Sequence, residues 1–265
     1  MRMGWPGLLL VLVGVAGCAS TSGDGPGGDL RERATASDQS DSERRARVRL
    51  ELASAYFAQG QTDTALDELK LSIAANPNLS DAYNLRGLIY ASLGDDALAE
   101  DSFRRALQID PRDGSAMHNY GWYLCQRQKF SQAQVQFQAA LALPQYRDAA
   151  RTHLARGICL TRVGDWAQAE AALMRSYELD PANPGTAVNL SEVLLRRGEY
   201  TRARFYVGRV NAQTATTNAQ SLWLAARIEH RMGNTRGAHD LGEQMRSRFP
   251  KAPEVGLFDR GRFDE

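Results

Sequence analysis

The chain has 265 residues, 43% of them hydrophobic and 24% charged, and its 32 Lys and Arg against 31 Asp and Glu leave a formal net charge of +1. This is the composition of an ordinary globular protein, which excludes wholesale disorder. The balanced charge gives no electrostatic reason to expect a nucleic acid as partner. Three cysteines in the whole chain exclude a disulfide-rich miniprotein and a cysteine-rich zinc module.

Residues 1–17 are predicted to be a lipoprotein signal peptide. Arg2 supplies a positive start, and the apolar and small residues from 4 to 16 form a run too short for a membrane-spanning helix, which needs about 20 residues. The run ends in Val15-Ala16-Gly17-Cys18, which resembles the lipobox of bacterial lipoproteins, whose cysteine is acylated and becomes the mature N-terminus. We therefore expect Cys18 to carry acyl chains such as palmitate; the alternative is a plain secretory peptide that is cut near this cysteine.

The segment 18–44 is predicted to be a flexible tether that begins with the lipidated cysteine. It is rich in Gly, Ser, Thr, Asp and Ala and has too few large apolar residues to offset the entropy of ordering. Ala19 occupies the second mature position, and the lack of Asp there resembles the sorting pattern of outer-membrane lipoproteins in diderm bacteria, which disfavours an inner-membrane location. We expect a lipid-anchored protein on the periplasmic face of the outer membrane.

A pattern of small, apolar and turn residues recurs about every 34 residues between 46 and 252. In the block 80–113, small residues allow two helices to approach closely and aromatic residues fill the space between them; these are Gly87, Ala99 and Ala106, and Tyr90 and Phe103. A Gly-Asp pair at 94–95 is expected to form the turn between the helices, and a proline at 111 to end the second helix. This block resembles a tetratricopeptide repeat.

The same pattern returns in five further blocks, so the repeat region 45–252 is predicted to hold six repeats, at residues 46–79, 80–113, 114–149, 150–183, 184–218 and 219–252. The few extra residues fall in turns between repeats, where an insertion costs least. A four-helix bundle or a coiled coil does not predict small residues and proline at this period. We expect an all-α fold, a right-handed superhelical solenoid of six helix-turn-helix repeats, with a degenerate last repeat and a C-terminal tail at 253–265.

The sequence contains no constellation that points to catalysis or to a metal. The HExxH, GxSxG and GxxxxGK patterns are absent, and the glycines between 23 and 28 lie in the tether rather than between a strand and a helix. The four histidines do not pair with one another or with a cysteine at helix-face spacing. We therefore expect a binding protein rather than an enzyme, with no catalytic residue, no metal and no cofactor.

Cys125 and Cys159 are expected on the first helices of the third and fourth repeats. Their positions within the repeat differ by two residues, about 200° around a helix, so the two side chains can face each other across the joint. In the oxidising periplasm such a pair is expected to form a disulfide. The alternative is two buried thiols that act as small hydrophobes.

The concave face of such a solenoid is lined by the first helix of each pair, and helical projection selects the residues that point into it. The candidate partner-binding residues are Arg47, Leu50, Phe57, Asn84, Leu88, His118, Trp122 and Arg162. At the far end the projection selects Glu192, Arg196, Trp223, Arg227 and Arg231. The groove is thus predicted to be apolar at its N-terminal end, which suits an amphipathic helix or an extended peptide, and basic at its C-terminal end, which suits acidic side chains. The alternative is that these positions are merely solvated helix faces.

Several local sequences go beyond the generic repeat. They are Asp-Ala-Tyr-Asn-Leu at 81–85, Asn-Tyr-Gly-Trp-Tyr-Leu-Cys at 119–125, Leu-Pro-Gln-Tyr at 143–146, Ser-Leu-Trp-Leu at 221–224 and Arg-Phe-Pro at 248–250. With the lipobox and the tether ahead of them, residues 44–256 resemble the PilF/PilW family of type IV pilus biogenesis proteins. The resemblance implies an outer-membrane pilotin, which binds secretin subunits, carries them to the outer membrane and promotes their multimerisation. A related role in that family is the stabilisation of assembled pili, or fimbriae.

The expected mechanism is stoichiometric binding, in which the N-terminal part of the groove, around Leu50, Phe57, Asn84 and Leu88, holds a segment of the secretin. The alternative is a periplasmic scaffold lipoprotein that regulates cell-wall hydrolases or envelope assembly, a role that other tetratricopeptide lipoproteins perform. Recovery of peptidoglycan enzymes without secretin in an affinity capture would favour that scaffold.

Overall fold

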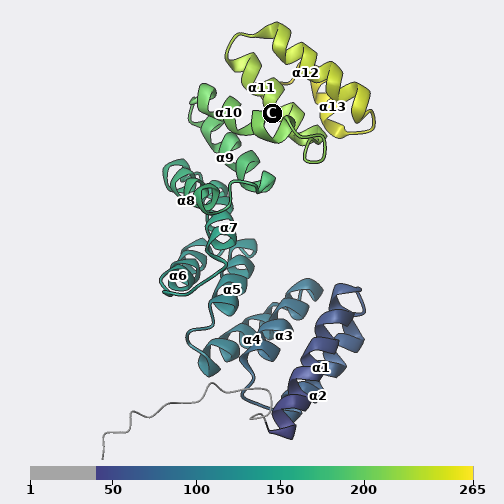
Figure 1. Ribbon diagram of the computed structural model, residues 1–265, viewed down its shortest axis with the longest axis vertical. Coiled ribbons are helices and arrows are strands. Elements are labelled where there is room, and N and C mark those ends of the chain that lie inside the picture. Colours follow the sequence, from purple (N-terminus) through teal and green to yellow (C-terminus); the bar gives the residue numbers. More distant parts are fainter. Residues whose placement is uncertain (1–39, 265) are drawn as a thin grey trace, which may run out of the picture. The chain divides into compact units, whose positions relative to one another are not determined.

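The computed structural model describes residues 40–264, and all of the regular structure in this range is helical (Figure 1). The expected signal peptide, Cys18 and most of the expected tether lie outside the described residues. The helices of the described part are α1 (Asp41–Ala58), α2 (Thr62–Ala75), α3 (Ser80–Leu93), α4 (Asp96–Ile109), α5 (Gly114–Gln126), α6 (Phe130–Leu141), α7 (Ala149–Arg162), α8 (Trp166–Leu179), α9 (Pro184–Arg196), α10 (Tyr200–Asn211), α11 (Ala219–Arg231), α12 (Thr235–Arg248) and α13 (Pro253–Asp259).

The helices stack as consecutive pairs, from α1 with α2 to α11 with α12 (Figure 1). The second helix of each pair also packs on the first helix of the next pair. First helices of successive pairs contact each other from α1 to α11, whereas second helices of successive pairs within residues 40–264 do not. The first helices therefore form the continuous inner layer of the stack. This arrangement confirms the all-helical solenoid predicted from the repeat pattern.

Small residues set the close contact between the two helices of a pair. A Cβ added at Gly87 of α3 would lie 2.8 Å from the Phe103 ring on α4, and a Cβ at Gly157 of α7 would lie 2.6 Å from the Leu173 side chain on α8. No side chain fits at such distances, because protein interiors are close-packed. Ala99, one turn before Phe103, is fully buried as well. The contact is the one that the spacing of small and large residues predicts.

The turn between the two helices of a pair contains a residue with positive φ. Gly94 supplies it in the second pair, with φ of 78°. The third pair has Gln128 there instead, with φ of 59°, a conformation that costs a non-glycine residue about 1 kcal/mol. Asp95 then caps α4, since its carboxylate accepts a hydrogen bond of 3.1 Å from the backbone N–H of Leu98. The predicted Gly-Asp pair therefore both turns the chain and starts the next helix.

The start of α1 differs from the sequence prediction, which extends the tether to residue 44. The helix begins at Asp41 because Ser40 and Glu43 form a capping box. The backbone N–H of Glu43 donates to the Ser40 hydroxyl at 3.3 Å, and the backbone N–H of Ser40 donates to the Glu43 carboxylate at 2.9 Å. These two bonds satisfy donors that a helix start otherwise leaves free, so the helix extends into the segment that composition alone marks as tether.

The expected C-terminal tail contains a further helix, α13, which packs on α11 and α12. Its Phe258 ring occupies the space beside Gly242 of α12, where a Cβ would come within 2.1 Å of the ring. Gly242 stands where the other repeats have a larger residue, and its missing side chain leaves room for an aromatic residue of the following helix. Met245 of α12, fully buried, packs in the same cluster as Val255 of α13. Helix α13 therefore covers the apolar end of the last pair.

Candidate partner-binding groove

The N-terminal end of the inner layer carries partly exposed apolar side chains. Leu50 and Phe57 of α1 are half-buried and pack against the core of the first pair. Leu88 of α3, the adjoining first helix, is half-buried against the core of the next two pairs. Arg47 is exposed one turn before Leu50. We call Leu50, Phe57 and Leu88 the N-terminal apolar patch; its members retain exposed surface that a partner can bury.

Two residues that the projection places in the groove instead hold first helices together. Asn84 of α3 is only 9% exposed, and its side-chain oxygen accepts a hydrogen bond of 3.1 Å from the side-chain amide of Asn119 on α5. His118 of α5 is 4% exposed, and its Nδ1 shares a hydrogen bond of 2.8 Å with the Thr152 hydroxyl on α7. Burial, helped by the charge of Arg151, lowers the pKa of His118 to about 4, so the ring is neutral at pH 7. The prediction that both line an open groove is wrong, because helical projection cannot distinguish a groove position from the contact between neighbouring first helices.

The middle of the inner layer has a cation–π pair. The Arg162 guanidinium of α7 lies over the Trp122 ring of α5, 5.4 Å from its centroid. Arg162 is exposed and Trp122 is half-buried. Both residues lie on successive first helices, and each keeps exposed surface.

The C-terminal arginines are largely paired, so this end is less basic than the residue types suggest. Glu192 of α9 forms ion pairs with Arg196 at 3.0 Å and with Arg227 of α11 at 2.9 Å. Arg227 is only 9% exposed, and its Nε is buried without a hydrogen-bond partner within the described residues. A cavity of about 540 Å³ lies between α9, α11 and α13, and apolar side chains that include Trp223 and Leu257 share its lining with Glu192 and Arg227. The C-terminal end of the inner layer thus holds a cavity of mixed apolar and charged character.

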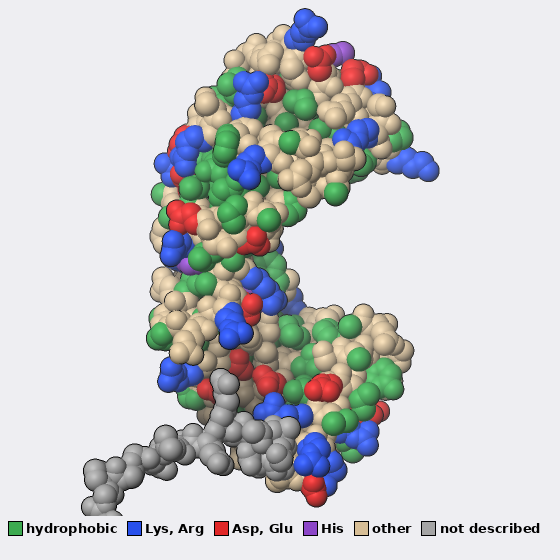
Figure 2. All heavy atoms as spheres, in the orientation of Figure 1, with side chains coloured by type: hydrophobic (Ala, Val, Ile, Leu, Met, Phe, Trp, Pro, Cys, Tyr) green, Lys and Arg blue, Asp and Glu red, His purple; other side chains and the backbone are tan. Residues whose placement is uncertain are grey.

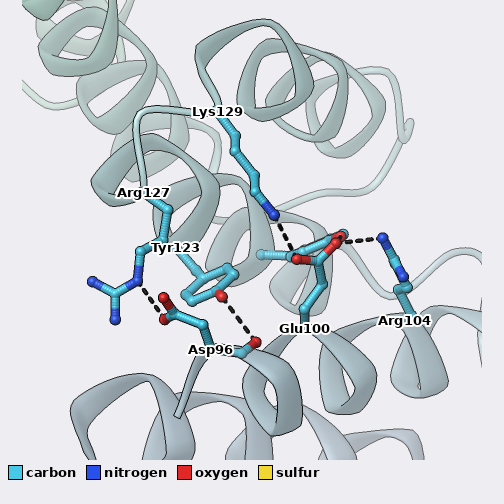
Figure 3. A network of polar contacts seen from close by, with 7 residues as sticks. Asp96, Glu100, Arg104, Tyr123, Arg127 and Lys129 are labelled. Carbon is cyan, nitrogen blue, oxygen red and sulfur yellow. Dashed lines mark hydrogen bonds and ion pairs between the residues drawn. The ribbon is translucent and has the colours of Figure 1, made fainter. Parts of the chain in front are cut away.

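A polar network between α4 and the third pair sets the joint between the second and third pairs (Figure 3). The Glu100 carboxylate accepts a hydrogen bond of 2.6 Å from Lys129 Nζ and also pairs with Arg104. The Tyr123 hydroxyl donates to the backbone carbonyl of Asp96 at 3.1 Å, and Arg127 pairs with the carboxylate of the same residue.

The bond from Lys129 is the main cause that holds the pKa of Glu100 below its usual value, so its carboxylate stays charged. The repeat pattern does not reveal this network, because it does not distinguish an ion-paired carboxylate from a solvated one. The one available signal is that Asp96 and Glu100 lie four residues apart and share a helix face.

Cys125 of α5 and Cys159 of α7 face each other across the joint between the third and fourth pairs. Both are fully buried, and their Cα atoms are 5.8 Å apart, within the range that a disulfide spans. They lie in one apolar cluster with Tyr123 and Ala155. The structure thus brings together the two cysteines whose positions in the repeat predict that they face each other.

The surface in Figure 2 shows acidic and basic side chains interspersed with apolar ones, in keeping with the balanced charge of the sequence. Among residues 40–264 no helix combines the length and the apolar character needed to cross a membrane. In the same range no three His, Cys, Asp or Glu side chains gather as a metal site.

Comparison with known proteins gives matches over most of the chain. One tetratricopeptide repeat family model matches residues 50–114 and 121–184, and a second such model matches residues 160–228. The type IV pilus assembly protein PilF of Pseudomonas aeruginosa is 26% identical over 251 residues, which cover 95% of this chain and 96% of that protein.

Among solved structures, PilW, described as a widely conserved type IV pilus biogenesis factor, superimposes with a TM-score of 0.74 at 28% identity. That alignment covers 80% of this chain and 97% of PilW. The structure of Pseudomonas aeruginosa PilF gives a TM-score of 0.75 at 23% identity, over 84% of this chain and 100% of PilF, and supports the fold.

Proposed function

The chain belongs to the tetratricopeptide repeat proteins and, among them, to the PilF/PilW type IV pilus biogenesis family, and from this premise we propose that it acts as a pilotin. In this role it binds secretin subunits and promotes their placement and multimerisation in the outer membrane, with acylated Cys18 as its anchor. The observation that carries the proposal is the match to PilF along nearly the whole length of both chains.

We propose the N-terminal apolar patch as the contact for the secretin. Leu50, Phe57 and Leu88 lie on adjoining first helices and keep part of their surface exposed. Burying such surface yields about 25 cal/mol per Å² of apolar area, so three side chains can supply the core of a binding site for an amphipathic helix or an extended segment. Arg47, exposed beside them, is available to an acidic residue of the bound segment.

A charge placed on the patch tests this contact. Leu50→Glu and Phe57→Glu should each abolish capture of the secretin, because a carboxylate would have to be desolvated at the interface. Leu71→Glu on α2 is the matched control, since Leu71 is 50% exposed on a second helix, outside the inner layer. Normal capture by both patch variants, with helicity unchanged by circular dichroism, would reject the patch as the site.

The wider proposal is tested in a strain that lacks the gene. The secretin should lose its detergent-resistant multimers or stay in the inner membrane, and the wild-type gene but not Cys18→Ala should restore the normal state. Normal secretin multimers in the outer membrane would reject the pilotin role and leave two alternative functions, stabilisation of pili or an envelope scaffold. Capture of peptidoglycan hydrolases without secretin would favour the scaffold.

We also propose that Cys125 and Cys159 form a disulfide in the periplasm. The supporting observations are the distance of 5.8 Å between their Cα atoms and their complete burial. The bond would join the first helices of the third and fourth pairs and so stiffen the middle of the groove.

A further inference from the structure

The residues after α13 return to the inner layer and cover the end of α11. The Phe263 ring stacks on the His230 imidazole, with ring centroids 4.3 Å apart and planes 11° apart, and lies 5.2 Å from the Trp223 ring. The Asp264 carboxylate pairs with the Arg231 guanidinium at 2.7 Å. An aromatic residue followed by an acidic one is thus held by an aromatic and basic surface on the first helix of the last pair.

These two residues form one wall of a cavity of about 450 Å³ at the end of the groove. The other walls come from the end of α9 and from α11, and their charged members are Arg196, Arg197, Arg227 and Arg231. We call this cavity the arginine pocket. Its lining contains four guanidinium groups and, in Asp264, one carboxylate. Guanidinium groups bind carboxylates in bidentate geometry and stack on aromatic rings, so the pocket suits a ligand that offers both.

The ion pair of Asp264 is open to water, whereas the Phe263 ring is half-buried against the apolar cluster that includes Trp223. The side chain of Asp264 is 78% exposed and that of Arg231 is 46% exposed. An ion pair so open to water contributes little to stability, so a competing carboxylate can replace it. Glu192 pairs with Arg196 and Arg227, and Glu170 and Glu199 pair with Arg197, so these three guanidinium groups have carboxylate partners outside residues 263–264. Arg231, in contrast, is paired with Asp264. Without Asp264 the pocket would carry one more unneutralised positive charge, on Arg231.

We propose that the arginine pocket is a second peptide-binding site, for a partner segment in which an aromatic residue is followed by an acidic one, and that such a segment displaces Phe263 and Asp264 from the wall of the pocket that they form. The site lies on α9 and α11, apart from the N-terminal apolar patch on α1 and α3, and does not depend on the pilotin role. The chain's own tail shows the register: the ring packs on His230 and the carboxylate reaches Arg231.

The probe for this site is a fluorescein-labelled peptide of sequence Gly-Arg-Phe-Asp-Glu, which copies residues 261–265. In fluorescence anisotropy titrations, the full chain with Phe263→Ala and Asp264→Asn should bind it at least ten-fold more tightly than the wild type, because the tail no longer competes. Adding Arg231→Glu to that double variant should weaken binding ten-fold or more. Adding Arg236→Glu instead is the matched control, since the side chain of Arg236 is 93% exposed on α12 and should leave the affinity unchanged.

Equal affinity of the wild type and the double variant, or indifference to Arg231→Glu while circular dichroism shows an intact fold, would overturn the proposal. A dimer of the wild type that the double variant abolishes, seen by light scattering after size exclusion, would assign the pocket to the tail of a second copy and also overturn it. Leu50→Glu should leave binding of the labelled peptide intact, and the Phe263→Ala, Asp264→Asn variant should still capture the secretin. The experiments therefore test the arginine pocket and the N-terminal apolar patch independently.

Discussion

Reduction of the disulfide proposed between Cys125 and Cys159 should lower the free energy of unfolding. The bond closes a loop with a sequence separation of 34 residues. In the chain-entropy model, a loop of this length restricts the unfolded chain by about 4 kcal/mol at 25 °C, and native disulfides commonly deliver about 2 to 4 kcal/mol. The loop spans one repeat and joins α5 to α7, so the bond should make the third and fourth pairs unfold together.

Urea unfolding followed by circular dichroism measures this effect. All samples carry Cys18→Ser, so that Cys125 and Cys159 are the only cysteines. One set is first unfolded in the presence of a reductant, so that the disulfide is fully reduced, and the other set is kept without reductant. The oxidised chain should be more stable by about 2 to 4 kcal/mol. The control is the double variant Cys125→Ala and Cys159→Ala, whose stability should not respond to the reductant. Because the oxidised and reduced samples have the same sequence, their difference in stability contains no contribution from cavities that a substitution would create.

Two outcomes would refute this reasoning. A difference below about 0.5 kcal/mol would show that closing the loop does not restrict the unfolded chain as the entropy model requires. Two titratable thiols per chain in periplasmic material that has been unfolded under non-reducing conditions would show that the bond does not form. The cysteines would then be buried hydrophobes, as the alternative interpretation of the sequence holds.

Further predictions concern buried groups. His118, whose pKa is lowered by burial from 6.5 to about 4, binds its proton only after unfolding, so stability should fall as pH drops from about 6.5 to 4, by up to about 3 kcal/mol. His118→Gln should flatten that fall in urea titrations, and an equal slope would contradict the assignment.

The pKa of Glu100 is held below 4.5 chiefly by the hydrogen bond from Lys129, so its contribution is present above that pH and lost as pH falls through the lowered value. Lys129→Met should therefore reduce the loss of stability on acidification below about pH 4.5, and an unchanged loss would show that the pair contributes nothing. Gly121→Ala should lower stability by about 1 to 3 kcal/mol, because its Cβ would lie 2.9 Å from a ring of α6, whereas Gly208→Ala, with nothing within 4 Å, should not.

The repeat architecture follows from the sequence because its contacts are local. Gly87 meets Phe103 sixteen residues further along the chain, and the same pairing recurs at Gly121 with Phe137 and at Gly157 with Leu173, so the spacing of small and large residues reveals it. The proximity of Cys125 and Cys159 follows from the same register. Contacts that repeat at a fixed period can be predicted from the sequence without knowing the whole fold.

Only the tertiary structure decides the contacts that lie outside this period. Helical projection puts Asn84 and His118 in the groove, but the close approach of neighbouring first helices buries them. The partner of Gly242 is Phe258, and the surface around His230 receives Phe263, although both aromatic residues belong to a segment without a repeat pattern. Their positions depend on the free apolar end of the last pair, which exists only once the stack has formed.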